Sequence, residues 1–222
     1  MRIPHHDIAR EALELSPYYS TLLNAPPRFK DFQDGMTKEE YIGYLGDDVD
    51  QSQHMNHTRA LTKLFMDHHN RQAPTFSPRD LGIMQLAAQT HDWAEAVVGD
   101  IPAPKKTAAD GKRESEVYGY IFDELLPIFP EFKEPCKDVI FDKTSRLGRA
   151  FNTVEHLGYL MTGLRAGAVS SALPTESPHR QPLRALADAV VPENLMIISK
   201  EPTPVYRGVL RALIRNHDVV KL

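Results

Sequence analysis

The sequence has only one cysteine, Cys136, among its 222 residues. A single thiol cannot form a disulfide within the chain, and it cannot supply the several thiolates of a cysteine-rich zinc site. Any metal ion bound by this chain would therefore have histidine and carboxylate ligands. The sequence contains 10 histidines and 30 aspartates and glutamates from which such ligands could be drawn.

Long hydrophobic runs and a large excess of charge are also missing. No stretch approaches the roughly 20 apolar residues of a membrane-spanning helix, and the N-terminal residues lack the apolar core of a signal peptide. A formal net charge of −4 has the wrong sign for broad electrostatic binding to nucleic acid. We therefore expect a cytoplasmic protein with neither a membrane nor a nucleic acid as partner.

The remaining composition is that of a globular protein, and the chain is long enough for one sizeable hydrophobic core. Helical spacing of apolar residues dominates, and no segment alternates apolar and polar residues as a half-buried strand does. We predict an all-α fold with a single domain over residues 1–222. The segment 167–192, rich in serine and proline, is predicted to be a surface loop between helices.

Capping signals predict where two helices begin and where one ends. Thr37 is followed three residues later by Glu40, which is the spacing of a capping box. Ser77 followed by Pro78 marks a second helix start, and Gly99 with the prolines after it predicts the end of that helix. Apolar periodicity predicts further helices over 52–69, 111–129, 145–164 and 204–217.

The segment THDWAEAVVGD, residues 90–100, places a histidine and acidic side chains inside an apolar helical pattern. On a helix, Glu95 is four residues after His91 and three after Asp92, so the three side chains can project towards one point. Buried carboxylates carry a large desolvation cost unless they are paired or bound to a cation. No lysine or arginine lies beside them, so the alternatives are a solvent-facing cluster and a metal site.

Two other segments carry side chains that could complete a metal site. His57 lies near the start of the helix predicted over 52–69, with His54 one turn earlier, and Glu155 lies within the helix predicted over 145–164. Imidazole and carboxylate groups from three helices are a common way to bind a divalent ion inside an all-helical protein. These segments favour the metal site over the solvent-facing cluster.

Taken in order, these residues resemble the H…HD…D pattern of the HD-domain metal-dependent phosphohydrolases. The segment HDWAEAVVGDIPAP is most similar to the branch that contains the 5′-deoxynucleotidases, in which the doublet is followed by a glutamate and a Gly-Asp-hydrophobic-Pro turn. The resemblance covers roughly Gln51 to Leu164, and it implies an HD core at about 51–164 with helical extensions on both sides. Glu155 stands where the family has an aspartate.

The resemblance implies a site for one divalent ion, with Mn, Co, Mg, Fe and Zn all compatible with its ligands. The implied ligands are His91, Asp92, Glu155 and a first histidine, for which His57 is favoured over His54 because the residues after it match the family. HD proteins with two metals have further histidines between the doublet and the last carboxylate. This chain has none there, so a single ion is expected.

The resemblance further implies a phosphomonoesterase that removes phosphate from deoxynucleoside 5′-monophosphates. Glu95 would order or deprotonate the attacking water. Asp100 would hold a sugar hydroxyl or protonate the leaving oxygen, although aspartate is also common in turns of this kind. Lys105, Lys106 and Tyr44 are candidate substrate contacts, with solvent-exposed lysines as the alternative for the first two.

The segment 39–53, directly before the histidines, departs from the family pattern. It supplies Tyr41 and Tyr44 but not the substrate-binding arginine that those nucleotidases carry. This departure and Glu155 leave two alternatives, a nucleoside triphosphate hydrolase of the same superfamily and a catalytically altered nucleotide-binding protein. A homodimer is the default association for a soluble enzyme of this kind.

Overall fold

The computed structural model describes residues 28–29, 32–33, 35–46, 50–99, 101, 106–125, 130–200, 208 and 211. Within these ranges the fold is all-α and contains no β-strand, so the predicted fold class is confirmed. None of the helices in these ranges combines the length and the apolar character that crossing a bilayer requires.

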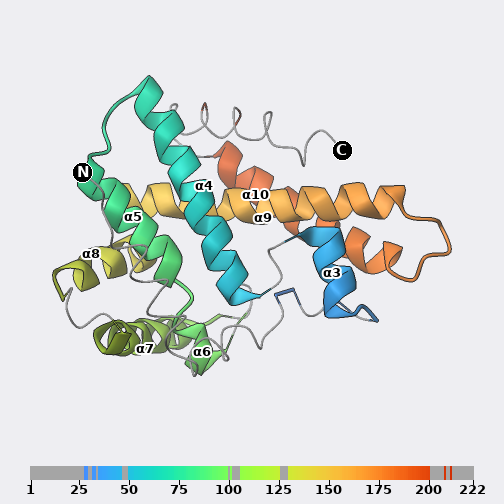
Figure 1. The fold of residues 1–222 in the computed structure, drawn as a ribbon, viewed down its shortest axis with the longest axis horizontal. Helices are drawn as coiled ribbons and strands as arrows, with labels where there is room; N and C mark the ends of the chain where they lie inside the picture. The colour runs from blue at the N-terminus through green and yellow to red at the C-terminus, as the bar shows by residue number, and fades with distance from the viewer. Residues whose placement is uncertain are drawn as a thin grey trace.

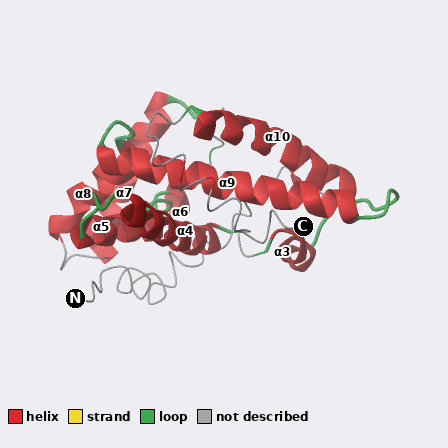
Figure 2. Cartoon of the chain, turned by 90° about the horizontal axis from the view of Figure 1, so that it is seen from above, coloured by secondary structure: helices red, strands yellow, loops and turns green. Residues whose placement is uncertain are grey.

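The helices surround one long central helix, α9 (Figure 1). In chain order they are α3 (Lys38–Leu45), α4 (Gln51–Gln72), α5 (Pro78–Thr90), α6 (Glu95–Val98), α7 (Ala108–Leu125), α8 (Pro130–Phe141), α9 (Arg146–Ala172) and α10 (Arg180–Ser199). Helix α9 packs against α3, α4, α5, α8 and α10, while α7 packs against α6 and α8. Figure 2 shows α10 and α4 on opposite sides of α9.

Two groups of buried apolar side chains hold the bundle together. The larger group joins α4, α5, α7, α8 and α9 and includes Phe65, Trp93 and Leu157. The smaller group joins α3 to α9 and α10 and includes Tyr41 and Leu183. Burying a large apolar side chain contributes about 1.5–3 kcal/mol to stability. The segments that carry His54, His91 and Glu155 all belong to the larger group and are held in place by it.

The predicted helix ends are present. Thr37 Oγ1 accepts a hydrogen bond from the N–H of Glu40 at 3.2 Å, and the Glu40 carboxylate accepts one from the N–H of Thr37 at 2.8 Å. Ser77 caps α5 ahead of Pro78. Gly99 ends α6 with a φ of 79°, a left-handed conformation that favours glycine. The two predicted helix starts are confirmed, and Gly99 does end a helix, although that helix is α6 and not the one that Ser77 begins.

The helix predicted to run without interruption to Gly99 is broken, so that prediction is wrong. Helix α5 ends at Thr90, residues 91–94 form a turn, and α6 follows. The N–H groups of Trp93 and Glu95 donate to carbonyls three residues earlier, each at 3.0 Å, which closes a tighter ring than an α-helix does. The His-Asp doublet therefore lies on a turn rather than on a continuous helical face.

The predicted surface loop over 167–192 is also wrong, because most of it is helical. Helix α9 continues to Ala172 and α10 begins at Arg180, so only residues 173–179 connect them. Leu183 of α10 is fully buried in the smaller group. Burial of an apolar face stabilises a helix more than the local preference of serine and proline for turns opposes it.

Helix α8 has no counterpart among the predicted helices. Pro135 lies inside it, and a proline within a helical pattern normally indicates a helix end. Cys136 and Val139 are buried in the larger group, so packing maintains the helix around the proline. The helix predicted over 204–217 lies outside the described residues, apart from residues 208 and 211.

Asp80 stabilises the start of α5. Its carboxylate accepts a hydrogen bond from the N–H of Ser77 at 2.8 Å and lies 3.0 Å from Nη2 of Arg146. Burial acts to raise the pKa of Asp80, but these contacts outweigh it and hold the pKa below its ordinary value. We expect Asp80→Ala to lower the free energy of unfolding by about 1–2 kcal/mol near pH 7.

Because the folded-state pKa of Asp80 is lowered, its stabilisation is present above the unfolded-state pKa of about 4 and is lost as pH falls through the folded-state pKa. Urea denaturation near pH 7 and near pH 3 should therefore show a smaller difference between wild type and variant at the lower pH. Asp188→Ala is the control, since its pair with Arg184 is exposed. An equal cost of Asp80→Ala at both pH values would contradict the expectation.

Candidate metal centre

Three side chains converge within the larger buried group, His54 from α4 and His91 and Asp92 from the turn that follows α5. One ligand atom of each lies within 4.8 Å of the other two. Nε2 of His54 is 3.8 Å from Oδ2 of Asp92, and Nε2 of His91 is 3.4 Å from Oδ1 of Asp92. A cation with bonds of about 2.0–2.2 Å separates its ligand atoms by about 3–4 Å. The spacing therefore suits one common ion.

His91 is oriented by the end of α5. Its Nδ1 lies 2.9 Å from the carbonyl oxygen of Ala88, and because a carbonyl only accepts hydrogen bonds, Nδ1 carries the proton. In the neutral imidazole Nε2 then carries the lone pair, and it lies 3.4 Å from Oδ1 of Asp92. A hydrogen bond from one ring nitrogen to a carbonyl is the usual way of fixing a metal-binding imidazole.

Two atoms of this group are buried and lack a hydrogen-bond partner among the described residues. They are Nε2 of His91 and Oδ2 of Asp92. Such atoms are uncommon, because leaving a buried polar group unsatisfied costs about 1–3 kcal/mol. Both are electron-pair donors near one point, and a cation would satisfy both. Imidazole and carboxylate ligands together suit Mn, Fe, Co and Zn, so the residues present fit a divalent metal ion.

The structure places His54, and not His57, beside the doublet. The carbonyl of Asp50, which caps α4, accepts a hydrogen bond from the N–H of His54 at 2.9 Å, so His54 lies in the first turn of the helix. His57 is three residues further on, about 4.5 Å along the axis and about 60° around it. It does not belong to the group of close ligand atoms. The residues after His57 resemble the family pattern, and for that reason the sequence favours His57 as the first ligand. They do not determine which side chain of α4 faces the turn 91–94.

Glu155 of α9 lies at the edge of the group. Its Oε1 is 4.0 Å from Nε2 of His91, and its Oε2 is 2.8 Å from Nζ of Lys143. Burial acts to raise the pKa of Glu155, but Lys143, His91 and His54 outweigh it and hold the pKa below its ordinary value. Glu155 is therefore an ionised carboxylate next to His91, although it lies outside the compact group of three.

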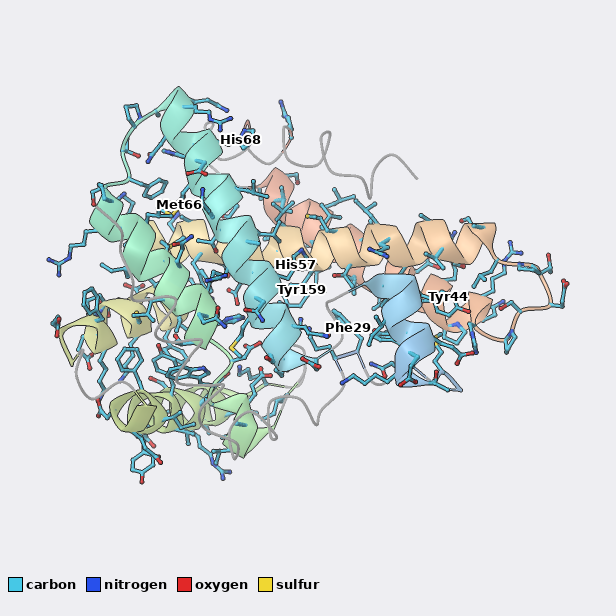
Figure 3. The ribbon with its side chains drawn as sticks, viewed as in Figure 1. Phe29, Tyr44, His57, Met66, His68 and Tyr159 are labelled. Carbon is cyan, nitrogen blue, oxygen red and sulfur yellow. The ribbon has the colours of Figure 1, made fainter. Side chains whose placement is uncertain are left out.

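Arg28 also reaches this group, and the sequence pattern did not identify it. Its side chain is only 6% exposed, and Nη1 lies 3.7 Å from Oδ2 of Asp92 and 2.9 Å from Oε1 of Gln51. The guanidinium carbon lies 5.2 Å from the ring centroid of Phe29 and 5.4 Å from that of Tyr159. Figure 3 shows Tyr159 beside α4 and Phe29 between α4 and α3. The structure thus supplies a buried arginine beside the doublet.

Tyr159 is the second unpredicted member of the site. Its ring stacks on that of His54, with centroids 6.0 Å apart and an interplanar angle of 25°. Burial raises the pKa of Tyr159 well above its ordinary value, so the hydroxyl stays protonated. The sequence did carry a signal for it, since Tyr159 is four residues after Glu155 and shares its helical face. For Arg28 the signal was an arginine followed by an aromatic residue, upstream of the segment 39–53.

Glu95 does not belong to the compact group, but a hydrogen-bonded glutamine connects it to the site. It is half-buried at the start of α6, and its Oε2 accepts a hydrogen bond from Nε2 of Gln51. The other end of the same amide, Oε1 of Gln51, accepts from Arg28 at 2.9 Å. One buried glutamine therefore links the predicted catalytic carboxylate to the arginine.

Lys106 approaches the site from the start of α7. Its Nζ forms an ion pair with Oε2 of Glu114, which is buried. Burial acts to lower the pKa of Lys106, but Glu114, with Glu95 and Asp92, outweighs it and raises the pKa. The ammonium group of Lys106 is therefore attracted by two carboxylates of the site as well as by its own partner.

The other predicted substrate contacts are not brought to the site. The hydroxyl group of Tyr44 forms a hydrogen bond with Nδ1 of His179 at 3.0 Å. Figure 3 shows Tyr44 on α3, away from Tyr159. Its ring packs against the smaller buried group, which draws it away from the doublet. Asp100 and Lys105 lie outside the described residues.

The centre thus contains the imidazoles of His54 and His91 and the carboxylate of Asp92. The carboxylate of Glu155 and the cationic side chains of Arg28 and Lys143 lie next to it. A scan against protein-family models, a search of curated proteins and a search of solved structures each found no match to this chain. Function is therefore inferred from the chemistry of the site and from the sequence pattern that led to it.

Proposed function

We propose that the protein is a metal-dependent phosphohydrolase of the HD type that removes phosphate from deoxynucleoside 5′-monophosphates. The observation that carries this proposal is the convergence of His54, His91 and Asp92 around buried donor atoms without a hydrogen-bond partner. His91 and Asp92 also form the doublet of the sequence pattern that resembles the HD phosphohydrolases, and His54 takes the place that the pattern gave to His57. A single bound divalent ion would polarise a phosphate oxygen and lower the pKa of a water nucleophile.

Arg28 is the residue best placed to bind the phosphate group. A guanidinium forms paired hydrogen bonds with phosphate oxygens, and this one is already held next to Asp92 by Gln51 and by two aromatic rings. Its position supplies the arginine that the segment 39–53 lacks. The rings of Phe29 and Tyr159 offer apolar surface beside the guanidinium, which suits the sugar or base of a nucleotide.

Glu95 is proposed as the general base. It is linked to Arg28 through Gln51 and contributes none of the three close ligand atoms, so we assign it the role of accepting a proton from water. The hydrogen bond from Gln51 sets its orientation. Lys106, drawn towards Glu95 and Asp92, would add positive charge for a phosphate dianion. We propose that the enzyme acts on small nucleotides in the cytoplasm.

Phosphate release from a panel of nucleotides tests the proposal. The purified protein, loaded with Mn²⁺, should release inorganic phosphate from deoxynucleoside 5′-monophosphates faster than from their ribonucleoside counterparts. Release of tripolyphosphate from nucleoside triphosphates would indicate the triphosphate hydrolase instead. Nucleotide binding without any release would indicate a catalytically altered binding protein, and absence of metal binding would refute both hydrolases.

A further inference from the structure

Solvent exposure rises steadily from the metal centre towards Lys143. The side chain of His91 is 4% exposed, that of Glu155 17% and that of Lys143 44%. These three groups form a chain of contacts, with 4.0 Å between His91 and Glu155 and 2.8 Å between Glu155 and Lys143. The ammonium group of Lys143 therefore lies on the solvent side of Glu155.

The backbone that carries Lys143 is held tightly. Oδ1 of Asp142 accepts a hydrogen bond from the N–H of Thr144 at 2.9 Å, and Ser145 caps α9. The chain packs so closely that a Cβ at position 148, where Gly148 stands, would lie 1.9 Å from the carbonyl oxygen of Asp142. Lys143 thus combines a fixed backbone with a long, half-exposed side chain that can change rotamer.

The ammonium group already lies against the wall of the metal centre. Nζ of Lys143 is 5.8 Å from the ring centroid of Phe151, and that ring stands edge-on to His91 with centroids 5.5 Å apart. Arg28 differs, because it is 6% exposed and is clamped by Gln51 and two rings. Of these two cations beside the carboxylates, Lys143 is the one that can move.

We propose that Lys143 is an exchangeable counter-ion of the metal centre, which neutralises Glu155 until a divalent ion binds and then contacts the phosphate group of the substrate. This inference rests on the proposed function. Lys143 and a divalent ion carry charge of the same sign and compete for one carboxylate, so each weakens the binding of the other. A released ammonium group beside the centre is a donor for a phosphate dianion.

The two halves of this role predict opposite effects of one substitution. In Lys143→Met the competitor for Glu155 is gone, so Mn²⁺ should bind about five- to tenfold more tightly to the EDTA-treated full chain. The phosphate contact is also gone, so inorganic phosphate should bind about tenfold more weakly to the Mn²⁺-loaded protein. Isothermal titration calorimetry measures both affinities. A merely structural role would weaken both.

Two variants provide matched controls. Lys143→Arg keeps the charge and should keep both affinities close to wild type. Lys63→Met removes a similarly exposed lysine, paired with Asp67 on α4, and should change neither affinity. Weaker Mn²⁺ binding by Lys143→Met, or unchanged phosphate binding, would overturn the inference while leaving the proposed function standing. A wild-type protein that binds no divalent ion would overturn both.

Discussion

Replacing Asp92 by asparagine is expected to lower the affinity for Mn²⁺ by about 100-fold or more, which corresponds to about 2.7 kcal/mol. Among the described residues, Asp92 supplies the carboxylate of the compact group, with oxygens 3.8 Å from Nε2 of His54 and 3.4 Å from Nε2 of His91. Asparagine keeps the shape but removes the negative charge that offsets a divalent ion in a buried place. Calorimetric titration of Mn²⁺ into the EDTA-treated variant measures the loss.

Two histidines on one helix provide a matched pair for the same measurement. His54→Ala should also weaken Mn²⁺ binding strongly, because His54 contributes one of the three close ligand atoms. His57→Ala changes the same residue type one turn away and should leave the affinity nearly unchanged. Equal losses from both variants, or wild-type affinity in Asp92→Asn, would refute the ligand set. Circular dichroism should first show that each variant is folded.

Replacing Glu95 by glutamine is expected to lower kcat by about 10²–10⁴-fold, the usual contribution of a general base. Glutamine retains an oxygen that can accept the hydrogen bond from Gln51, so the local structure should persist. Because Glu95 lies outside the compact group of ligand atoms, Mn²⁺ affinity should stay close to wild type. Phosphate release from a deoxynucleoside 5′-monophosphate and Mn²⁺ titration measure the two quantities.

Glu116→Gln serves as the control for Glu95. Glu116 forms an exposed pair with Lys112 on α7, so its loss should change neither kcat nor metal affinity. A Glu95→Gln variant that loses Mn²⁺ would show that Glu95 is a ligand. A Glu95→Gln variant with full activity would show that another group deprotonates the water. That group would be neither Lys106 nor Arg28, because both side chains are protonated at neutral pH and cannot accept a proton.

Several features of the protein follow from residues close together in the sequence. The helical fold class, the capping boxes at Thr37 and Ser77 and the helix end at Gly99 depend on hydrogen bonds and apolar spacing within a few residues. The doublet of His91 and Asp92 was recognised in the same way. Local signals of this kind persist in the folded state because the groups involved are neighbours in any compact form of the chain.

The composition of the metal centre depends on how the helices pack. Which histidine of α4 faces the doublet is set by the rotation of that helix against α5 and α9, so the sequence around His57 could not reveal that His54 lies there. Arg28 and Tyr159 reach the centre from distant segments, and the break after Thr90 aims the doublet into the bundle. At these positions the burial of apolar helix faces across the whole fold has a larger effect on the structure than the conformational preference of the local sequence. Contacts between residues far apart in the chain therefore had to be seen in three dimensions.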